Sequence, residues 1–184
     1  LMWPVEMLYA KGIAHAAGWS PTVVDLHVEE FERDELVRHL VNLGPDMLLI
    51  DTMTPTMAYA REIAGAVLDR IPDLKIWGIG QHATEQSEDL LYQGSPISGV
   101  LLGEYPGSVA DLLACRGERS VDGSAVRGAD GTIIRTGKKR EINDCDSLPP
   151  LDPTGLHLER YRMRSIHVPK FGNVKWGYLL TSRG

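Results

Sequence analysis

Trp77-Gly78-Ile79-Gly80-Gln81-His82-Ala83-Thr84 joins an apolar strand pattern over residues 74–77 to a helical pattern. A strand that ends in Gly-x-Gly lets the main chain approach a bulky group closely, because glycine has no Cβ and tolerates positive φ. Further along, Gly99-Val-Leu-Leu-Gly103-Glu104 repeats this arrangement of a short apolar strand, a glycine and a helix start. Two such strand ends predict a ligand-binding edge of a sheet.

Working outward from this stretch, strand and helix patterns alternate with short connections. Helices are expected over residues 4–18, 31–41, 57–71, 85–92 and 108–114, strands over 47–50, 74–77 and 99–102, and a β-branched run covers 22–26. This alternation is typical of a parallel sheet wound by right-handed crossovers. We therefore expect an α/β fold with an open parallel sheet wound by helices, of flavodoxin-like or Rossmann-like kind. Ligands of such sheets bind outside the carboxyl ends of the strands.

The alternation of strand and helix patterns ends after Cys115. Two β-branched runs flank Gly128-Ala-Asp-Gly131 and predict a β-hairpin. The three prolines within residues 144–153 exclude regular structure there, because proline lacks an N–H and restricts the residue before it. We divide the chain into an α/β domain (1–117), a hairpin extension (118–143), a proline-rich linker (144–173) and a final strand segment (174–184).

Composition excludes several classes of function. The net charge of -6 and the single short basic run, Lys138-Lys139-Arg140, argue against a nucleic-acid partner. No apolar run approaches the ~20 residues that span a bilayer, so we expect no membrane partner. Two cysteines, Cys115 and Cys145, are too few for a disulfide framework, and no signal peptide is visible, so we expect a cytoplasmic protein.

The residues offer no convincing catalytic or metal site. Ser87, His82 and Asp51 lack the sequence context of a nucleophile elbow, and the other histidines lie on separate elements. Neither cysteine has a partner at zinc-ligand spacing. Gly78-Ile-Gly80 lacks the third glycine of a dinucleotide fingerprint, and no Gly-Lys-Ser/Thr is present. A plain doubly wound domain with glycines in tight turns therefore stays open as an interpretation.

Several stretches together resemble a known family in the family's own order. These are a long helix with its closing glycine over 4–18, Val23-Val-Asp25, Pro45-Asp-Met-Leu-Leu-Ile-Asp-Thr-Met-Thr54, Gly80-Gln-His-Ala-Thr84, Gly103-Glu104, Ile142-Asn-Asp-Cys-Asp-Ser-Leu-Pro149 and Gly177-Tyr-Leu-Leu-Thr-Ser-Arg-Gly184. They resemble the cobalamin-binding domain that precedes the barrel of cobalamin-dependent radical S-adenosylmethionine enzymes. Ile79 replaces one glycine of the family's Gly-Gly turn, and Pro106 replaces the second carboxylate of its Gly-Glu-x-Glu turn.

The resemblance implies a cobalamin cofactor and a set of contacts at the strand ends. The implied cofactor-binding residues are Thr52, Met53, Thr54, Gly78, Gly80, Gln81, His82, Thr84, Gly103 and Glu104. It also implies that the family's first strand precedes Leu1 and that no histidine binds cobalt from residues 1–4. No residue of this chain is implied as catalytic or as a metal ligand.

The resemblance further implies that residues 174–184 begin a barrel and that the sequence stops just before the Cys-x-x-x-Cys-x-x-Cys motif. A four-iron four-sulfur cluster and S-adenosylmethionine are then expected only in an intact parent enzyme, whose downstream barrel binds the substrate. This piece alone would be inactive. The parent reaction would be methyl transfer to an unactivated carbon or a related radical reaction, by a methyltransferase or a cyclase.

Two other interpretations stay open at this point. One is a free-standing corrinoid carrier or cobalamin-dependent sensor without catalysis. The other is a flavodoxin-like domain that binds a different ligand, such as a flavin, or a protein partner. The proline-rich linker and the strand at the end of the sequence favour a domain of a larger enzyme.

Overall fold

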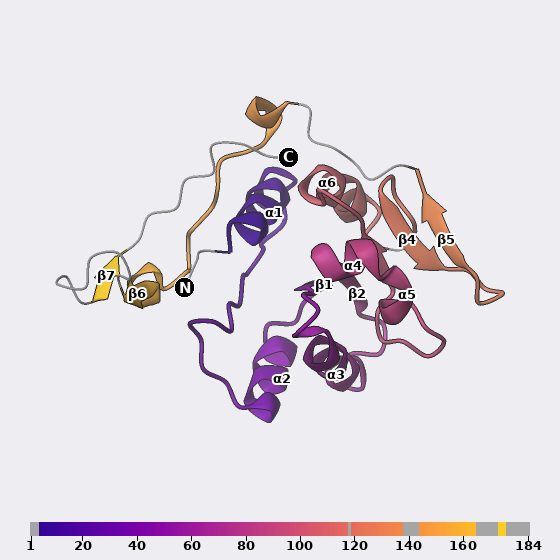
Figure 1. The fold of residues 1–184 in the computed structure, drawn as a ribbon, viewed down its shortest axis with the longest axis horizontal. Helices are drawn as coiled ribbons and strands as arrows, with labels where there is room; N and C mark the ends of the chain where they lie inside the picture. The colour runs from indigo at the N-terminus through magenta and orange to yellow at the C-terminus, as the bar shows by residue number, and fades with distance from the viewer. Residues whose placement is uncertain (1–3, 118, 138–143, 165–172, 176–184) are drawn as a thin grey trace.

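The fold is known from a computed structural model that describes residues 4–117, 119–137, 144–164 and 173–175. A five-stranded sheet with the order β1-β2-β3-β4-β5 forms its centre (Figure 1). The first three strands are parallel, and the last two continue the sheet in antiparallel fashion. Their bounds are β1 Met47–Asp51, β2 Lys75–Ile79, β3 Gly99–Leu101, β4 Ser124–Arg127 and β5 Ile133–Thr136.

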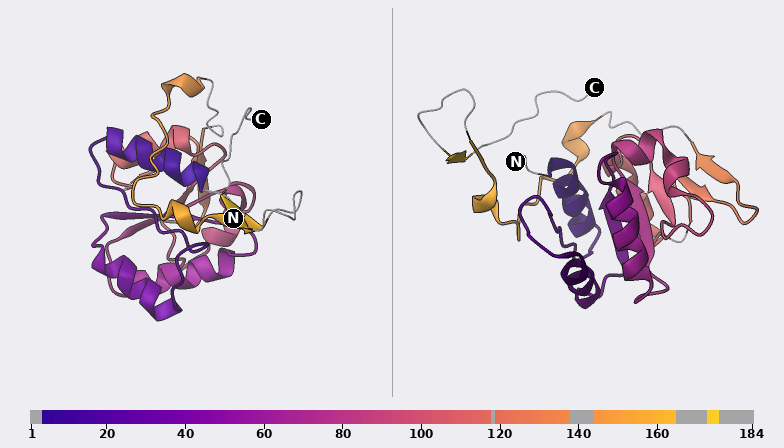
Figure 2. Two further views of the ribbon diagram at one scale, coloured as in Figure 1. Left: turned by 90° about the vertical axis from the view of Figure 1, so that its left-hand side faces the viewer. Right: turned by 60° about the horizontal axis from the view of Figure 1, so that its bottom comes forward.

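Helices cover both faces of the sheet, as the views in Figure 2 show. Helices α1 (Val5–Ala16) and α6 (Pro106–Ala114) pack over one face, and α2 (Arg33–Asn42) and α3 (Met57–Leu68) pack over the other. The short helices α4 (Gln81–Glu85) and α5 (Ser87–Leu90) follow β2. Side chains of β2 alternate between the two cores: Ile76 lies in the α2/α3 core, and Trp77 and Ile79 lie in the α1/α6 core. The predicted open α/β sheet is therefore confirmed.

Two local expectations were wrong. Strand β2 continues to Ile79 instead of ending at Trp77, because Ile79 still pairs with Asp51 of β1. The β-branched run over 22–26 forms no strand. Among the described strands, β1 therefore pairs only with β2 and is an edge strand of the sheet. Val24 nevertheless packs against the α2/α3 core.

The predicted hairpin is present and belongs to the main sheet, since β4 pairs with β3 from Gly99 to Leu101. Beyond it, the short 3-10 helix η1 (Cys145–Ser147) leads into residues 148–161, which we call the strap. The strap runs back along α1 and includes η2 (Leu158–Arg160) (Figure 1).

After the strap, β6 (Arg162–Arg164) pairs antiparallel with β7 (Asn173–Lys175). The strand expected from residue 174 onward therefore overlaps β7 at its start, and residues 176–184 lie outside the described ranges. None of the described helices has the length and hydropathy of a membrane-spanning segment.

Candidate functional site

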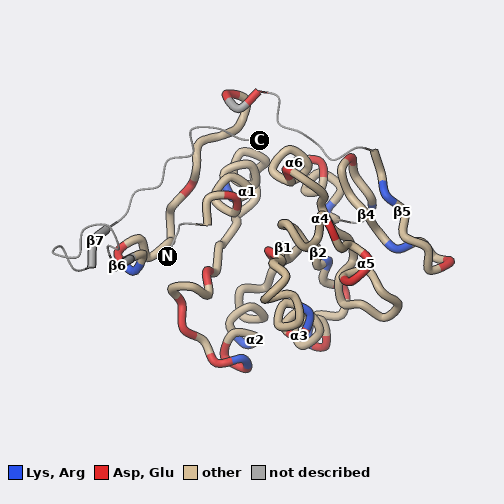
Figure 3. Tube along the Cα trace, viewed as in Figure 1, with Lys and Arg blue, Asp and Glu red and all other residues tan. Residues whose placement is uncertain are grey.

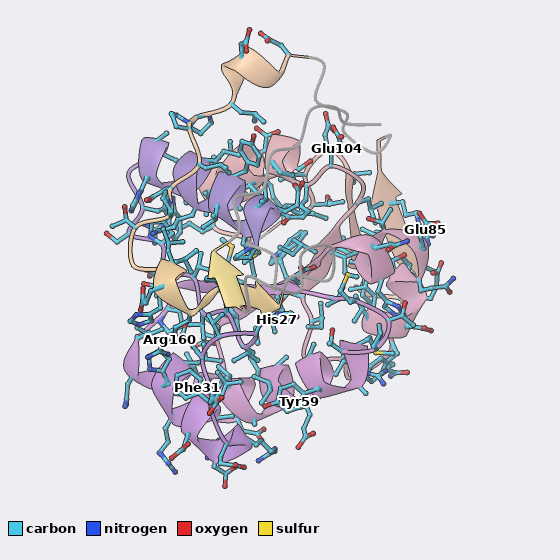
Figure 4. All side chains as sticks on the ribbon, turned by 60° about the vertical axis from the view of Figure 1, so that its left-hand side comes forward. His27, Phe31, Tyr59, Glu85, Glu104 and Arg160 are labelled. Atoms are coloured by element: carbon cyan, nitrogen blue, oxygen red, sulfur yellow. The ribbon has the colours of Figure 1, made fainter. Side chains whose placement is uncertain are left out.

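Three loops meet at the carboxyl edge of the parallel strands. They comprise residues 51–56 from the last residue of β1, 80–86 after β2, which include the short helix α4, and 102–105 after β3, and together we call them the rim. Parallel strands place their carboxyl ends at one edge of the sheet, so the rim forms there as the sequence predicted. Figure 4 labels Glu85 in the second loop, Glu104 in the third and Tyr59 near the start of α3.

Thr52 ties the first loop to the second. Its backbone N–H and its hydroxyl both donate to the carbonyl oxygen of Ile79, each at 2.8 Å. In return, the carbonyl of Thr52 accepts from the N–H of His82 at 3.1 Å, and its Oγ1 accepts from the N–H of Ala83 at 3.2 Å. Thr52 is fully buried. Its hydroxyl therefore fixes the geometry of the loops and is not exposed to a ligand.

Thr84 ties the second loop to the third in the same manner. Its hydroxyl donates to the carbonyl of Gly80 at 3.0 Å and accepts from the N–H of Gly103 at 2.9 Å. Both hydrogen-bonding directions of the hydroxyl are thus used within the protein. Together Thr52 and Thr84 hold all three loops of the rim as one unit.

The two glycines of the Gly-x-Gly turn have different environments. Gly80 has a φ of 96° and a ψ of -172°, a combination that is essentially restricted to glycine. A Cβ at Gly80 would collide with the carboxylate of Asp51 and lie 3.1 Å from the carbonyl oxygen of Thr52. Gly78 instead lies buried within β2, where a Cβ would lie 3.1 Å from Val100 Cγ1. Gly80 therefore allows the first two loops to pack closely together, and Gly78 serves packing beneath the rim.

His82 is buried, with 4 % of its surface exposed. Its Nδ1 lies 3.2 Å from Thr54 Oγ1, and its Nε2 lies 3.5 Å from Asp89 Oδ2. The Nε2 atom is closed to solvent and makes no hydrogen bond with any residue that the structure describes. Both ring nitrogens thus face protein atoms.

The outer surface of the rim combines apolar and polar groups. Met53 is 47 % exposed and Tyr59, at the start of α3, is 39 % exposed. Thr54 in the first loop and Gln81 in the second are exposed, and Glu104 in the third is half-buried. Tyr59 was not predicted, because a lone aromatic near a helix start carries no specific signal in the sequence.

Asp51 was also missing from the cofactor-binding residues that the sequence implied, although it lies in the stretch from Pro45 to Thr54. Desolvation at the rim, followed by the nearby carboxylate of Glu6 on α1, raises the pKa of Asp51 above its ordinary value. Its carboxylate lies against the backbone of Gly80, where an added Cβ would collide with it. The loop between α1 and α2 adds further acidic residues, as Figure 3 shows.

These features fit a flat apolar ligand that carries amide arms. Exposed apolar side chains can contact a corrin disc, and the exposed Thr54 and Gln81 can bind its amides. Within the described ranges, no three His, Cys, Asp or Glu side chains are placed to hold a metal ion directly.

The structure defines a doubly wound α/β domain whose strand-end loops gather at one edge of the sheet, where domains of this class bind their ligands. The B12 binding domain model matches residues 2–113, well over half of the chain. The chain therefore belongs to the B12-binding domain family, whose ligand is cobalamin.

Comparisons with individual proteins agree with this family. The chain is 25 % identical over 156 residues to the anaerobic magnesium-protoporphyrin IX monomethyl ester cyclase of Cereibacter sphaeroides, covering 80 % of this chain and 25 % of the cyclase. The structure of the cobalamin-dependent S-adenosylmethionine radical enzyme OxsB with aqua-cobalamin and S-adenosylmethionine bound matches with a TM-score of 0.68 at 14 % identity, over 81 % of this chain and 22 % of that one. The apo structure of OxsB matches with a TM-score of 0.57 at 14 % identity, over 80 % of this chain and 22 % of that one. At this identity the structural matches show the shared fold.

Proposed function

We propose that this chain is the cobalamin-binding portion of a radical S-adenosylmethionine enzyme. The observation that carries the proposal is the rim: three strand-end loops, held together by Thr52 and Thr84, in a chain whose residues 2–113 match the B12 binding domain. The cyclase and OxsB support it as relatives, and this chain spans 25 % and 22 % of their lengths.

The rim residues divide into two groups under this proposal. Met53, Thr54, Gln81 and Glu104 contact the corrin or its amide arms, and Gly80 makes room for Asp51 and Thr52 behind them. The other predicted residues, Thr52, Gly78, His82, Thr84 and Gly103, hold these contacts in place. When bound, cobalamin supplies a cobalt centre that can carry a methyl group, and the protein supplies binding and orientation.

Under this proposal, each of the four segments of the chain has the role that the sequence analysis expected. Residues 1–117 form the cobalamin-binding unit, 118–143 the hairpin extension, 144–173 a linker, and 174–184 the start of a catalytic barrel. That barrel binds the substrate, the iron-sulfur cluster and S-adenosylmethionine, in a cytoplasmic protein. Methyl transfer to an unactivated carbon, or a related radical reaction such as a cyclisation, is the reaction class.

The gene product that contains this chain provides the test. It is purified anaerobically, reconstituted with iron, sulfide and hydroxocobalamin, and assayed for cleavage of S-adenosylmethionine to 5′-deoxyadenosine. We expect bound cobalamin, a four-iron four-sulfur cluster and reductant-dependent cleavage. Cobalamin without a cluster would instead establish a carrier or sensor, and absence of both would favour a domain for another ligand.

A further inference from the structure

The imidazole of His82 lies between two side chains that differ in their hydrogen-bonding capacity. The hydroxyl of Thr54, 3.2 Å from Nδ1, can donate or accept a hydrogen bond. The carboxylate of Asp89, 3.5 Å from Nε2, can only accept. The neutral ring is therefore best satisfied when Nε2 carries the proton toward Asp89 and Nδ1 accepts from Thr54.

Burial of the His82 ring makes a wrongly placed ring proton costly. His82 Nε2 is closed to solvent, so water does not compensate for a misplaced proton on the ring. The side chain of Asp89 is 52 % exposed, which leaves it room to close on the ring. Arg61 donates to the backbone carbonyl of Asp89 at 3.2 Å and fixes the chain there, so the Asp89 carboxylate is not engaged by that contact.

The tautomer of His82 determines whether the Thr54 hydroxyl acts as a hydrogen-bond donor or acceptor at the rim. When its hydroxyl proton points inward to Nδ1, the exposed oxygen of Thr54 presents only lone pairs outward. Such an oxygen accepts from an N–H donor and repels a carboxylate. The periphery of cobalamin carries carboxamide arms, which supply N–H donors.

We propose that Asp89 and His82 are positioning residues that hold Thr54 as a hydrogen-bond acceptor for a carboxamide N–H of the corrin. The inference rests on the proposed binding of cobalamin at the rim and adds a selectivity for amide over acid at one corrin arm. Asp89 lies in α5, outside the strand-end loops, and its spacing from Thr54 gave no signal in the sequence.

The tautomer is tested without cofactor. In ¹⁵N-labelled protein, the ring nitrogen shifts of His82 report which nitrogen carries the proton. We expect only the Nε2–H form in the wild type and in Asp89→Asn, whose amide oxygen still accepts, and a mixture of tautomers in Asp89→Ala. An Nδ1–H tautomer in the wild type would overturn the inference, whatever the protein binds.

Selectivity is tested with hydroxocobalamin and its monocarboxylic acids, in which one carboxamide is hydrolysed. We expect the wild type to bind at least one acid isomer about tenfold more weakly than hydroxocobalamin, since one hydrogen bond is replaced by repulsion. Thr54→Val should reduce that ratio to about twofold or less, and Thr54→Ser should keep it. Asp89→Asn should also keep it, whereas Asp89→Ala should weaken it.

The outcomes separate the two proposals. Equal binding of all acids by a wild type that binds hydroxocobalamin normally would overturn this inference alone. No binding of hydroxocobalamin by the wild type would overturn the proposed function and this inference with it. If Thr54→Val discriminates between hydroxocobalamin and the acid as strongly as the wild type does, the selectivity belongs to another residue and the inference is overturned.

Discussion

The phenol of Tyr161 donates a hydrogen bond to the carboxylate of Asp25, with 2.5 Å between Oη and Oδ2. The two residues are far apart in sequence, and both are buried. Burial, followed by this hydrogen bond, raises the pKa of Tyr161, so the phenol stays protonated and remains a donor. The contact anchors the end of the strap to the loop that follows α1, beside the hydrogen bond from Arg160 to the carbonyl of Val28.

Replacing Tyr161 with Phe should lower the free energy of unfolding. The change leaves the buried carboxylate of Asp25 without this donor, and hydrogen bonds to charged groups contribute about 1.5–3 kcal/mol. Urea unfolding of the wild type, Tyr161→Phe, Asp25→Asn and the double variant measures the coupling between the two side chains. Additive effects of the two changes would show that the contact contributes nothing.

The middle of the strap should give the protein an acid-dependent component of stability. Hydrogen bonds from Thr154, followed by the charges of Lys11 and His15, lower the pKa of Asp152 to about 2. Because the folded-state pKa lies below the ordinary value of 3.8, the stabilisation is present above that pH and is lost as the pH falls toward 2. Melting curves between about pH 6 and pH 2 should fall less steeply for Asp152→Asn than for the wild type. Parallel curves would contradict this assignment.

Two helical glycines provide a matched test of the strap's contact with α1. A Cβ at Gly12 would lie 2.6 Å from the carbonyl oxygen of Pro150, whereas a Cβ at Gly65 of α3 would meet nothing within 4 Å. Gly65→Ala should stabilise the protein by about 0.5–1 kcal/mol, because alanine favours helix. Gly12→Ala should destabilise it by about 1–3 kcal/mol and expose the strap to proteolysis. Equal stabilisation by both changes would show that the strap does not lie on Gly12.

Gly80 and Gly94 form a second matched pair, since both have positive φ. Gly94→Ala meets open space and should cost about 1 kcal/mol from backbone strain alone. Gly80→Ala adds a collision with Asp51 and should cost about 1–3 kcal/mol more. Chemical denaturation compares the two variants directly. A smaller cost at Gly80 than at Gly94 would mean that Asp51 does not lie over this glycine.

The sequence was sufficient for the layout of the domain and for the edge of the sheet at which the strand-end loops gather. Strand and helix periodicities gave the parallel strands and the helices on both faces, because these elements follow local patterns of burial. The positions of Gly80 and Gly103 followed from the same logic, since glycines at strand ends serve turns that other residues avoid.

What the sequence could not provide was the direction of individual side chains. The hydroxyls of Thr52 and Thr84 were expected to face a ligand, and the structure shows them bonded to Ile79 and Gly103. A hydroxyl residue at a strand end can turn inward or outward, and only tertiary packing decides between them. The path of the strap could not be predicted either. Its prolines predicted irregular structure, but its contact with Lys11 joins residues 143 positions apart, and no local pattern indicates such a contact.

Binding of hydroxocobalamin to the purified chain is the measurement that tests the rim most directly. Equilibrium dialysis should give one bound corrin per chain in the wild type and in Gly94→Ala, with altered visible absorbance that persists after desalting. Gly80→Ala, compared at a temperature where circular dichroism shows it folded, should bind at least about tenfold more weakly, because its methyl group displaces Asp51 and the backbone of Thr52 and so disturbs the loops that form the rim. A folded wild type that retains no corrin, or a Gly80→Ala variant that binds as tightly as Gly94→Ala, would contradict the account.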